Sequence, residues 1–198
     1  MKWLIGIDEA GRGPLAGPVS VGVVLVKPDF DWETIPGVGD SKKVTAKNRA
    51  SIFLLATKLK KEGLIDFQVS LVGADAIDSK GIVPSIKLGM SRCLNSLQKR
   101  HNFLHENVHV KLDGSLKAPV EFTHQETIIK GDSKELCIGL ASILAKVTRD
   151  QHMERLSVKY PLYSFDVHKG YGTKKHLLCI RENGLTDIHR RTFCRRLT

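Results

Sequence analysis

Apolar and polar positions follow two different periods along the chain, and these periods predict strands and helices in turn. The run Val19–Val26 is dense in β-branched residues, which is typical of a buried strand. We expect further strands over residues 3–8, 65–72, 108–112 and 127–130. We expect helices over residues 45–62, 84–100, 134–159 and 173–183. Strands that alternate with helices in this way indicate an α/β domain built on one sheet.

The segment between the first two predicted strands, residues 11–18, has the composition of a turn. Pro14 and Pro18 disfavour a helix there. Gly11, Gly13 and Gly17 come close to a dinucleotide-binding fingerprint, but the prolines and the preceding acids argue against that interpretation. The chain contains no G-x-x-x-x-G-K-[ST] motif, which disfavours a P-loop ATPase. Backbone groups of such a turn can contact a sugar hydroxyl or a phosphate, and a plain hairpin turn is the alternative.

Three acidic residues stand where predicted strands end. Asp8 and Glu9 close the first apolar segment, and Asp113 follows the predicted strand 108–112. Neighbouring strand residues point to opposite faces, so Asp8 and Glu9 can serve one site only if the strand ends there. Acids at such places also act as ordinary turn formers, and the pattern alone leaves both interpretations open.

A fourth acid falls on the apolar side of the predicted helix 134–159. Spacings of four, three, four and three residues connect Leu136, Leu140, Ile143, Val147 and Asp150. A carboxylate among apolar neighbours is costly unless a cation accompanies it. Lys146, one turn earlier than Asp150, is one candidate cation, and a bound metal ion is the other. The spacing leaves both open.

The chain also carries an excess of positive charge. Its 198 residues include 31 Lys and Arg against 21 Asp and Glu, so the formal net charge is +10. Such an excess points to a polyanionic partner, nucleic acid first and an acidic membrane surface second, and a solvated basic surface is the alternative. Carboxylate oxygens are ligands that Mg²⁺ and Mn²⁺ prefer. A carboxylate cluster in a basic protein is what metal-assisted cleavage of a phosphodiester requires.

Several classes of protein are disfavoured by what the sequence lacks. No apolar run approaches the ~20 residues needed to span a bilayer. The first apolar segment meets acidic residues before the core of a signal peptide could form. Four scattered cysteines form no C-x-x-C pair; they are Cys93, Cys137, Cys179 and Cys194. We therefore expect a soluble, cytoplasmic, single-domain protein with reduced thiols.

Two further groups of residues are candidates for contacts with a ligand. Tyr171 stands between two glycines in a basic stretch, where its ring could stack on a sugar or base or pack on the core. Ser41, Lys42 and Lys43 offer a hydroxyl and two ammonium groups to phosphates, or form a plain loop before the next helix. The histidines between residues 101 and 109 recur every four positions, but the strand predicted from residue 108 interrupts a shared helix, so we expect them on the surface.

The chain resembles the ribonuclease HII family in blocks that follow the family's order and cover nearly its whole length. The blocks are IDEAGRGPLAGPV (7–19), DSKK (40–43), LDG (112–114), KGD (130–132), ASILAKVTRD (141–150), HKGYGT (168–173) and HRRTF (189–193). The resemblance implies an α/β fold of the RNase H type, a mixed β-sheet flanked by helices. It further implies a catalytic domain over residues 1–160 and a helical, substrate-binding C-terminal segment over residues 161–198 packed on it.

The activity that the resemblance implies is metal-dependent endonucleolytic cleavage of RNA paired to DNA. It extends to single ribonucleotides embedded in duplex DNA, cut on their 5′ side to leave 3′-hydroxyl and 5′-phosphate ends. The expected partners are RNA/DNA hybrids and ribonucleotide-containing DNA, with no membrane, and we expect a monomer. The alternatives are an enzyme of the ribonuclease HIII type and a non-catalytic module that binds hybrids.

The resemblance also assigns roles to individual residues. Two Mg²⁺ or Mn²⁺ ions would be held by four catalytic acids, Asp8, Glu9, Asp113 and Asp150. The backbone of Gly11, Arg12 and Gly13 would recognise the 2′-hydroxyl at an RNA–DNA junction, and Tyr171 would stack on the following deoxyribose. The remaining expected substrate contacts are Ser41, Lys42, Lys43, Lys146 and Thr173.

Overall fold

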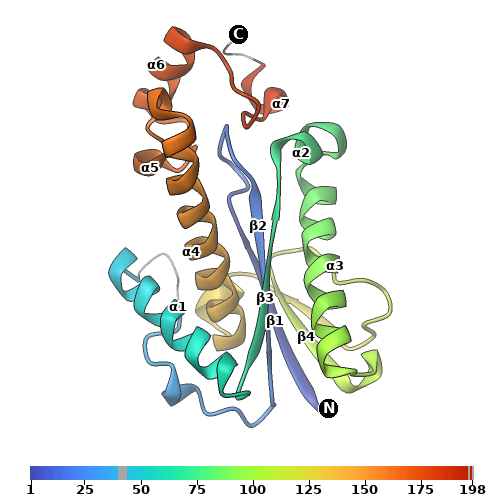
Figure 1. Cartoon of the computed structure of the whole chain (residues 1–198). Helices are drawn as coiled ribbons and strands as arrows, with labels where there is room; N and C mark the ends of the chain where they lie inside the picture. The colour runs from blue at the N-terminus through green and yellow to red at the C-terminus, as the bar shows by residue number, and fades with distance from the viewer. Residues whose placement is uncertain (40–43, 196, 198) are drawn as a thin grey trace.

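The computed structural model describes residues 1–39, 44–195 and 197, and within these residues five strands form one mixed sheet (Figure 1). The strands are β1 (Trp3–Ala10), β2 (Val19–Val26), β3 (Asp66–Val72), β4 (Val108–Asp113) and β5 (Gln125–Ile128), in the spatial order β3-β2-β1-β4-β5. β2 is antiparallel to β1 and β3, whereas β4 is parallel to β1 and to β5. The first strand of the chain therefore lies at the centre of the sheet.

Helices cover both faces of this sheet (Figure 1). One face carries α1 (Ala46–Lys61) and α4 (Leu136–Lys159), and the other carries α2 (Ala74–Lys80) and α3 (Ile82–His101). The chain then continues beyond α4 through α5 (Phe165–His168), α6 (Lys174–Asn183) and α7 (Arg191–Cys194). Short 3₁₀ turns are η1 (Trp32–Thr34), η2 (His105–Asn107), η3 (Gly131–Ser133) and η4 (Pro161–Tyr163). The predicted α/β class, a mixed sheet flanked by helices, is confirmed.

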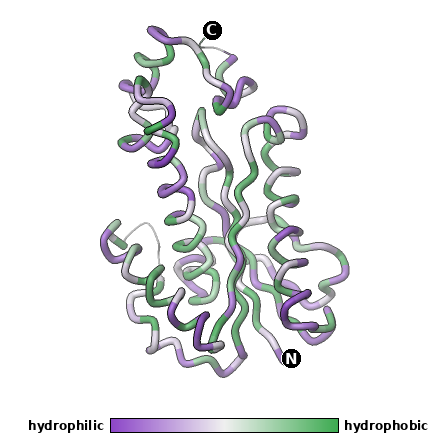
Figure 2. Tube along the Cα trace, viewed as in Figure 1, coloured by the Kyte–Doolittle hydropathy of each residue, from purple (hydrophilic) through white to green (hydrophobic). Residues whose placement is uncertain are grey.

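The sheet separates two hydrophobic layers, as its alternating side chains require. Ile7 and Val21 pack with α3, whereas Val24 packs with α1 and α4 on the opposite face. Hydrophobic positions accordingly run along the central strands and the helix sides that face them (Figure 2). β2 is buried along its whole length, which agrees with its predominance of β-branched apolar residues.

Two glycines allow α4 to cross the sheet at very short range. A Cβ on Gly6 would lie 2.3 Å from the Cys137 carbonyl group, and one on Gly22 would lie 2.3 Å from the Ala141 carbonyl oxygen. Real Cβ atoms do not approach backbone so closely, so only glycine fits at these strand positions. The close approach places Ser142 of α4 within hydrogen-bonding reach of Asp8 on β1.

The segment after α4 has a hydrophobic cluster of its own, which joins it to the turn between β1 and β2. Tyr163, Phe165 and Ile180 pack there with Ala16 of the turn and Met153 of α4. An isolated β-bridge pairs Ala16 with His189. The C-terminal segment is thus packed on α4 and on the glycine-rich turn at once.

Three of the differences between the predicted and the observed elements have a clear local cause. The short strand expected over residues 127–130 is β5 at Gln125–Ile128, because Lys130 adopts a left-handed conformation with φ of 56° and starts η3. α3 begins at Ile82, before Pro84, since proline is tolerated in the first turn of a helix. The short helix α2 was not predicted, because seven residues carry too little periodicity to stand out.

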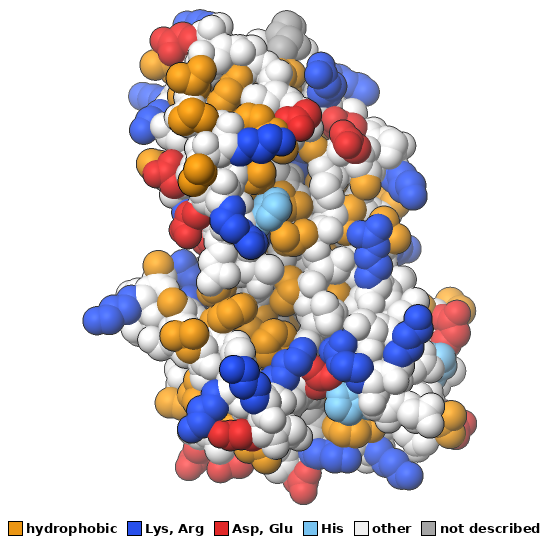
Figure 3. Space-filling view, in the orientation of Figure 1, with side chains coloured by type: hydrophobic (Ala, Val, Ile, Leu, Met, Phe, Trp, Pro, Cys, Tyr) orange, Lys and Arg blue, Asp and Glu red, His pale blue; other side chains and the backbone are white. Residues whose placement is uncertain are grey.

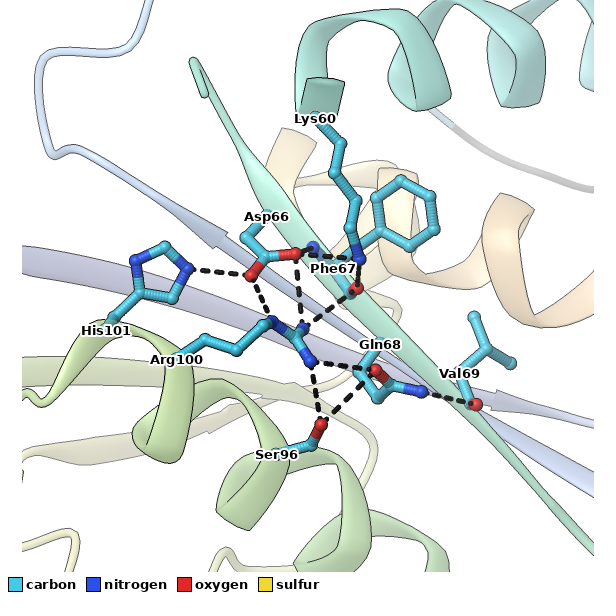
Figure 4. A network of polar contacts seen from close by, with 8 residues as sticks. All are labelled: Lys60, Asp66, Phe67, Gln68, Val69, Ser96, Arg100 and His101. Carbon is cyan, nitrogen blue, oxygen red and sulfur yellow. Dashed lines mark hydrogen bonds and ion pairs between the residues drawn. The ribbon is translucent and has the colours of Figure 1, made fainter. Parts of the chain in front are cut away.

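Asp66 at the start of β3 ties the two helical layers together (Figure 4). Its carboxylate accepts hydrogen bonds from Arg100 Nε at 2.8 Å and forms an ion pair with Lys60 Nζ at 2.9 Å. The ring Nε2 of His101 lies 2.7 Å from the same carboxylate, so this residue has a structural contact beyond the surface position predicted for it. These donors hold the pKa of Asp66 well below its usual range, although burial opposes them.

Lysine and arginine side chains are spread over the face drawn in Figure 3 rather than gathered in one patch. The excess of positive charge is therefore distributed on this side of the molecule. Among the described residues, no helix combines the length and the apolar character that crossing a bilayer would take.

Candidate active site

A cavity of about 650 Å³ opens where β1 and β4 end side by side. Because these strands are parallel neighbours, their carboxyl ends meet at one edge of the sheet. Four acids line this cavity together with basic and small residues; they are Asp8, Glu9, Asp113 and Asp132. The sequence predicted the first three of them as strand-end acids, and the structure brings these three together.

Asp8 is one of the two most buried of these acids, with 6% of its surface exposed. Its Oδ1 accepts a hydrogen bond from the Glu9 amide at 2.7 Å, and its carboxyl group also has a hydrogen bond with Ser142. Burial raises the pKa of Asp8 to about 8, and the negative charges of Glu9 and Asp113 add to that effect. Burial and the neighbouring like charges thus disfavour the ionised form of the Asp8 carboxyl group.

Glu9 shares the cavity with Asp8 although it is the next residue along the strand. Burial raises the pKa of Glu9, and the hydrogen bond and charge of Arg12 oppose this rise. The distance from Arg12 Nη1 to Glu9 Oε1 is 2.9 Å. β1 ends at Ala10, and Gly11 then turns the chain with φ of 88°. The strand therefore continues one residue beyond Glu9, further than the prediction required, and both acids nevertheless line the cavity at its end.

Asp113 and Asp132 come together because the chain returns to the end of β4 through a tight loop. The amide of Gly131 donates to Asp113 Oδ1 at 2.6 Å. A Cβ on Gly131 would lie 2.7 Å from Ile138 Cδ1, so glycine permits this approach. Asp132 follows directly in η3 and is 6% exposed.

Asp132 is a site residue that our sequence reasoning missed. The block Lys130-Gly131-Asp132 was noted as part of the family resemblance, but no role was given to its acid. The available signal was the position of Asp132 soon after a short predicted strand that, like β1 and β4, ends at the edge of the sheet. The apolar spacing of the long helix drew attention to Asp150 instead.

Asp150 is not among the residues that line the cavity. It lies on α4 with its carboxylate Oδ1 2.8 Å from Lys146 Nζ, one helical turn earlier. Lys146, one of the two cations that the sequence left open for Asp150, is thus in contact with it. Lys146 itself lines the cavity, so Asp150 holds a basic side chain at the edge of the acidic cluster.

The glycine turn, defined here as residues 11–18, forms a second wall of the cavity. Gly11, Arg12 and Gly13 line it, and a Cβ on Gly13 would meet nothing within 4 Å. The Arg12 side chain is 51% exposed at the cavity while its guanidinium pairs with Glu9. Tyr171 also lines the cavity, and its ring centroid lies 5.7 Å from Arg149 Cζ.

Basic side chains line the cavity alongside the acids. Arg49 lines it together with Lys146 and was not predicted from the sequence. Its guanidinium Nη1 donates to the Val44 carbonyl oxygen, which joins the start of α1 to the residues before it. Thr173, an expected substrate contact, is not among the residues that line the cavity. It caps α6, where its Oγ1 accepts from the His176 amide at 3.3 Å. The predicted contacts Ser41, Lys42 and Lys43 lie outside the described residues.

The residues present fit a divalent cation held by oxygen ligands. The cavity gathers carboxylates, and the buried Asp8 carboxylate in particular would be stabilised by a cation. Within the part of the chain that the structure describes, no three acidic, histidine or cysteine side chains are grouped closely enough to form a closed metal site. Mg²⁺ does not require one, since it keeps several waters and uses one or two carboxylates with substrate phosphates.

The chain is similar in sequence and in structure to known proteins. The family model for ribonuclease HII matches residues 5–196. A ribonuclease HII of Endomicrobium trichonymphae is 43% identical over 188 residues, which are 95% of this chain and 83% of that protein. The crystal structure of ribonuclease H2 from Pyrococcus horikoshii OT3 is similar with a TM-score of 0.73 and 27% identity, over 98% of this chain and 96% of that one. A structure of Bst-RNase HIII in complex with Mn²⁺ shares the fold, with a TM-score of 0.68 and 20% identity over 92% of this chain and 63% of that chain.

Proposed function

The chain belongs to the ribonuclease HII family and is a ribonuclease H endonuclease, and on that premise we propose which substrates it cleaves. They are the RNA strand of RNA/DNA hybrids and single ribonucleotides embedded in duplex DNA, which it cuts on their 5′ side. The products carry 3′-hydroxyl and 5′-phosphate ends. The observation that supports this function best is the joining, in one cavity, of four acids with the open backbone of the glycine turn. We also propose that it acts as a monomer.

The acids Asp8, Glu9, Asp113 and Asp132 are the proposed ligands of divalent cations, Mg²⁺ or Mn²⁺. When bound, such cations activate water and stabilise the departing oxygen of a phosphodiester. The protein's own part is orientation: the Glu9 amide and Ser142 fix the Asp8 carboxylate, and the Gly131 amide fixes that of Asp113. Mn²⁺ in the Bst-RNase HIII complex supports the class of metal. Asp132 replaces Asp150 in this proposal because Asp132 lines the cavity.

The glycine turn is the proposed reader of the ribonucleotide. A 2′-hydroxyl is the group that distinguishes RNA from DNA at one nucleotide. The backbone at Gly11, Arg12 and Gly13 can contact that hydroxyl without touching a base, so cleavage is expected to be largely independent of sequence. Tyr171, 42% exposed at the same cavity, is placed to stack on the neighbouring sugar.

The phosphate backbone on either side of the cut is the proposed partner of the basic residues. Lys146 and Arg49 line the cavity beside the acids, where they can meet phosphates. Ser41, Lys42 and Lys43 remain proposed phosphate contacts on the grounds of their sequence alone.

One experiment tests this function directly. The purified protein is incubated with three duplexes that differ only in sugar content: all-DNA, DNA with one ribonucleotide, and a long RNA/DNA hybrid. Each is tested with Mg²⁺, with Mn²⁺ and with EDTA. We expect metal-dependent nicks in the second and third duplexes and none in the first. Binding without any nick would favour the non-catalytic alternative, and nicking of the long hybrid alone would refute recognition of single ribonucleotides.

A further inference from the structure

Two arginines are fully buried beside the glycine turn, Arg149 on α4 and Arg190 immediately before α7. Buried guanidinium groups usually pair with carboxylates, because an unpaired buried charge is unfavourable. In the described part of the chain, the partners of both groups are instead backbone carbonyl oxygens of the turn. Two buried positive charges therefore hold the backbone of the glycine turn in place.

Arg190 binds the turn at both of its ends. Its Nη2 donates to the Gly11 carbonyl oxygen at 2.7 Å, and its Nη1 donates to that of Arg12 at 2.8 Å. Its Nε donates to the Gly17 carbonyl oxygen at 2.9 Å. A planar guanidinium with fixed donors can hold two consecutive carbonyls in this way, which a single ammonium group cannot do.

These contacts determine where the amide groups of the turn point. In a planar trans peptide, the N–H points away from the C=O of the same peptide unit. The carbonyls of Gly11 and Arg12 point at Arg190, so the amides of Arg12 and Gly13 point away from it. Gly11, Arg12 and Gly13 line the cavity. The hydrogen bonds of Arg190 therefore leave two amide donors, at residues that line the cavity, directed away from the guanidinium.

Arg149 supports the same turn from α4. Its Nε donates to the Pro18 carbonyl oxygen at 2.9 Å and its Nη2 to that of Ala16 at 3.2 Å. A Cβ on Gly11 would lie 2.1 Å from Arg149 Nε, so the guanidinium packs directly against that glycine. Arg149 Nη1 is buried with no hydrogen-bond partner in the described residues.

The arrangement is costly for a purely structural device. Burial, together with the charge of Arg149, lowers the pKa of Arg190 to about 9. An apolar side chain of similar volume would avoid both the buried charges and the unsatisfied Nη1 donor. The feature that an apolar residue could not supply is the orientation of the carbonyls, and with it that of the amides.

We propose that Arg190, assisted by Arg149, is a positioning residue for substrate recognition that aims the Arg12 and Gly13 amides at the ribonucleotide sugar. The inference deepens the proposed function and rests on it. Neither arginine touches the substrate; both act through the glycine turn.

The test replaces Arg190 by lysine, which keeps the charge but loses the forked contact. The matched control is Arg92→Lys, at an exposed position on α3. For each protein, kcat and KM are measured on duplex DNA with one ribonucleotide, and amide hydrogen exchange is measured over residues 11–18 and over β2. For Arg190→Lys we expect kcat to fall at least ~10-fold with KM changed less than ~3-fold, and exchange in residues 11–18 to rise at least ~10-fold while β2 stays protected. Arg92→Lys should leave all four quantities near wild type.

Unchanged exchange over residues 11–18 in Arg190→Lys, or a kcat within ~3-fold of wild type, would overturn the inference. If Arg190→Lys loses protection in β2 as well, Arg149→Lys is tested in its place, and it must show the same division between turn and strand. A wild-type protein that fails to nick any duplex would refute the proposed function, while the exchange data would still decide whether Arg190 holds the turn.

Discussion

The amide of Gly131 donates to Oδ1 of Asp113 at 2.6 Å, so the end of β4 and the loop that carries Asp132 are fixed to each other. This contact explains how two acids separated by 18 intervening residues line one cavity. It also allows the structural role of the Asp113 side chain to be tested apart from its charge. A side-chain oxygen at position 113 can accept the hydrogen bond from the Gly131 amide whether or not it carries a charge.

The assignment of Asp132 in place of Asp150 leads to a paired prediction. Asp132→Asn should lower kcat at least ~100-fold, because it removes a ligand charge from the cavity. Asp150→Asn removes only the partner of Lys146 and should lower kcat less than ~10-fold. Steady-state rates in Mg²⁺ on duplex DNA with one ribonucleotide decide between them. The reverse order of severity would restore Asp150 to the metal site.

Asp113→Asn should abolish cleavage while largely sparing the binding of hybrid. The asparagine Oδ1 can still accept from the Gly131 amide, so the loop is expected to keep its place. The charge that would hold a cation is lost. Fluorescence anisotropy with a labelled hybrid in Ca²⁺ or EDTA measures binding, and a gel assay in Mg²⁺ measures cleavage. Near-normal turnover would contradict the role of this acid.

Asp8→Asn should make the metal-free protein more stable. Burial raises the pKa of Asp8 to about 8, above its ordinary value of 3.8. The folded state therefore binds a proton that the unfolded state has lost between these pH values, and the ionised side chain destabilises the folded protein as pH rises toward 8. We expect Asp8→Asn to raise the free energy of unfolding at pH 8 by on the order of 1–3 kcal/mol in EDTA.

Denaturant titrations at pH 8 and pH 4 check this prediction, with the exposed Asp29→Asn as the control. The gain should shrink toward pH 4, where Asp8 is protonated in the folded state. A loss of stability at pH 8 would show that the Asp8 charge is already compensated.

Asp66→Asn should have the opposite effect. The pKa of Asp66 is held well below its usual range by Arg100, Lys60 and His101, so its charge stabilises the folded state. This contribution is complete above the ordinary pKa near 4 and is lost as pH falls below it. At pH 7 we expect Asp66→Asn to lower the free energy of unfolding by about 2 kcal/mol. The difference from wild type, measured by thermal unfolding, should narrow at pH 3; a constant difference would point to packing instead.

A cluster of buried histidines in the C-terminal segment predicts sensitivity to acid. His176 Nε2 lies 3.1 Å from His189 Nε2, and His176 Nδ1 lies 2.9 Å from the Tyr171 carbonyl oxygen. Burial lowers the pKa of both rings to about 4. The unfolded state therefore takes up protons first as pH falls from about 6.5, and stability declines from there toward pH 4.

NMR titration of the ring protons should give midpoints near 4 for His176 and His189. Midpoints near the ordinary value would contradict the prediction. Urea titrations between pH 7 and pH 4.5 should show the accompanying fall in the free energy of unfolding.

Strong periodicity made most of the fold predictable from sequence. β2 is recognisable in the sequence because it is rich in β-branched apolar residues, and the structure buries every one of its residues. α1 is recognisable because Thr45 caps it as expected, with its Oγ1 accepting from the Asn48 amide at 3.2 Å. The three acids at the ends of β1 and β4 could be predicted because a short apolar segment that ends at a carboxylate can be recognised in the sequence alone.

The position of the other acids depends on three-dimensional contacts, which the spacing of apolar residues in the sequence does not predict. Asp132 enters the cavity through a left-handed residue, Lys130, and a close approach at Gly131. Asp150 satisfied the helical spacing, but spacing shows only which side of a helix a residue occupies. The contact between Asp150 and Lys146 follows from their i, i+4 spacing on α4. Whether that side of the helix also reaches the cavity depends on how α4 crosses the sheet, a crossing that Gly6 and Gly22 allow.

The hydrogen bonds from Arg190 to Gly11 and Arg12 have a consequence for the order in which the protein is made. Arg190 follows Gly11 by 179 positions, so a ribosome makes the glycine turn and the acids of the cavity well before it adds Arg190. A nascent chain therefore carries these acids before the turn can be held by Arg190. A chain interrupted before Arg190 would lack the contacts that we propose orient the Arg12 and Gly13 amides.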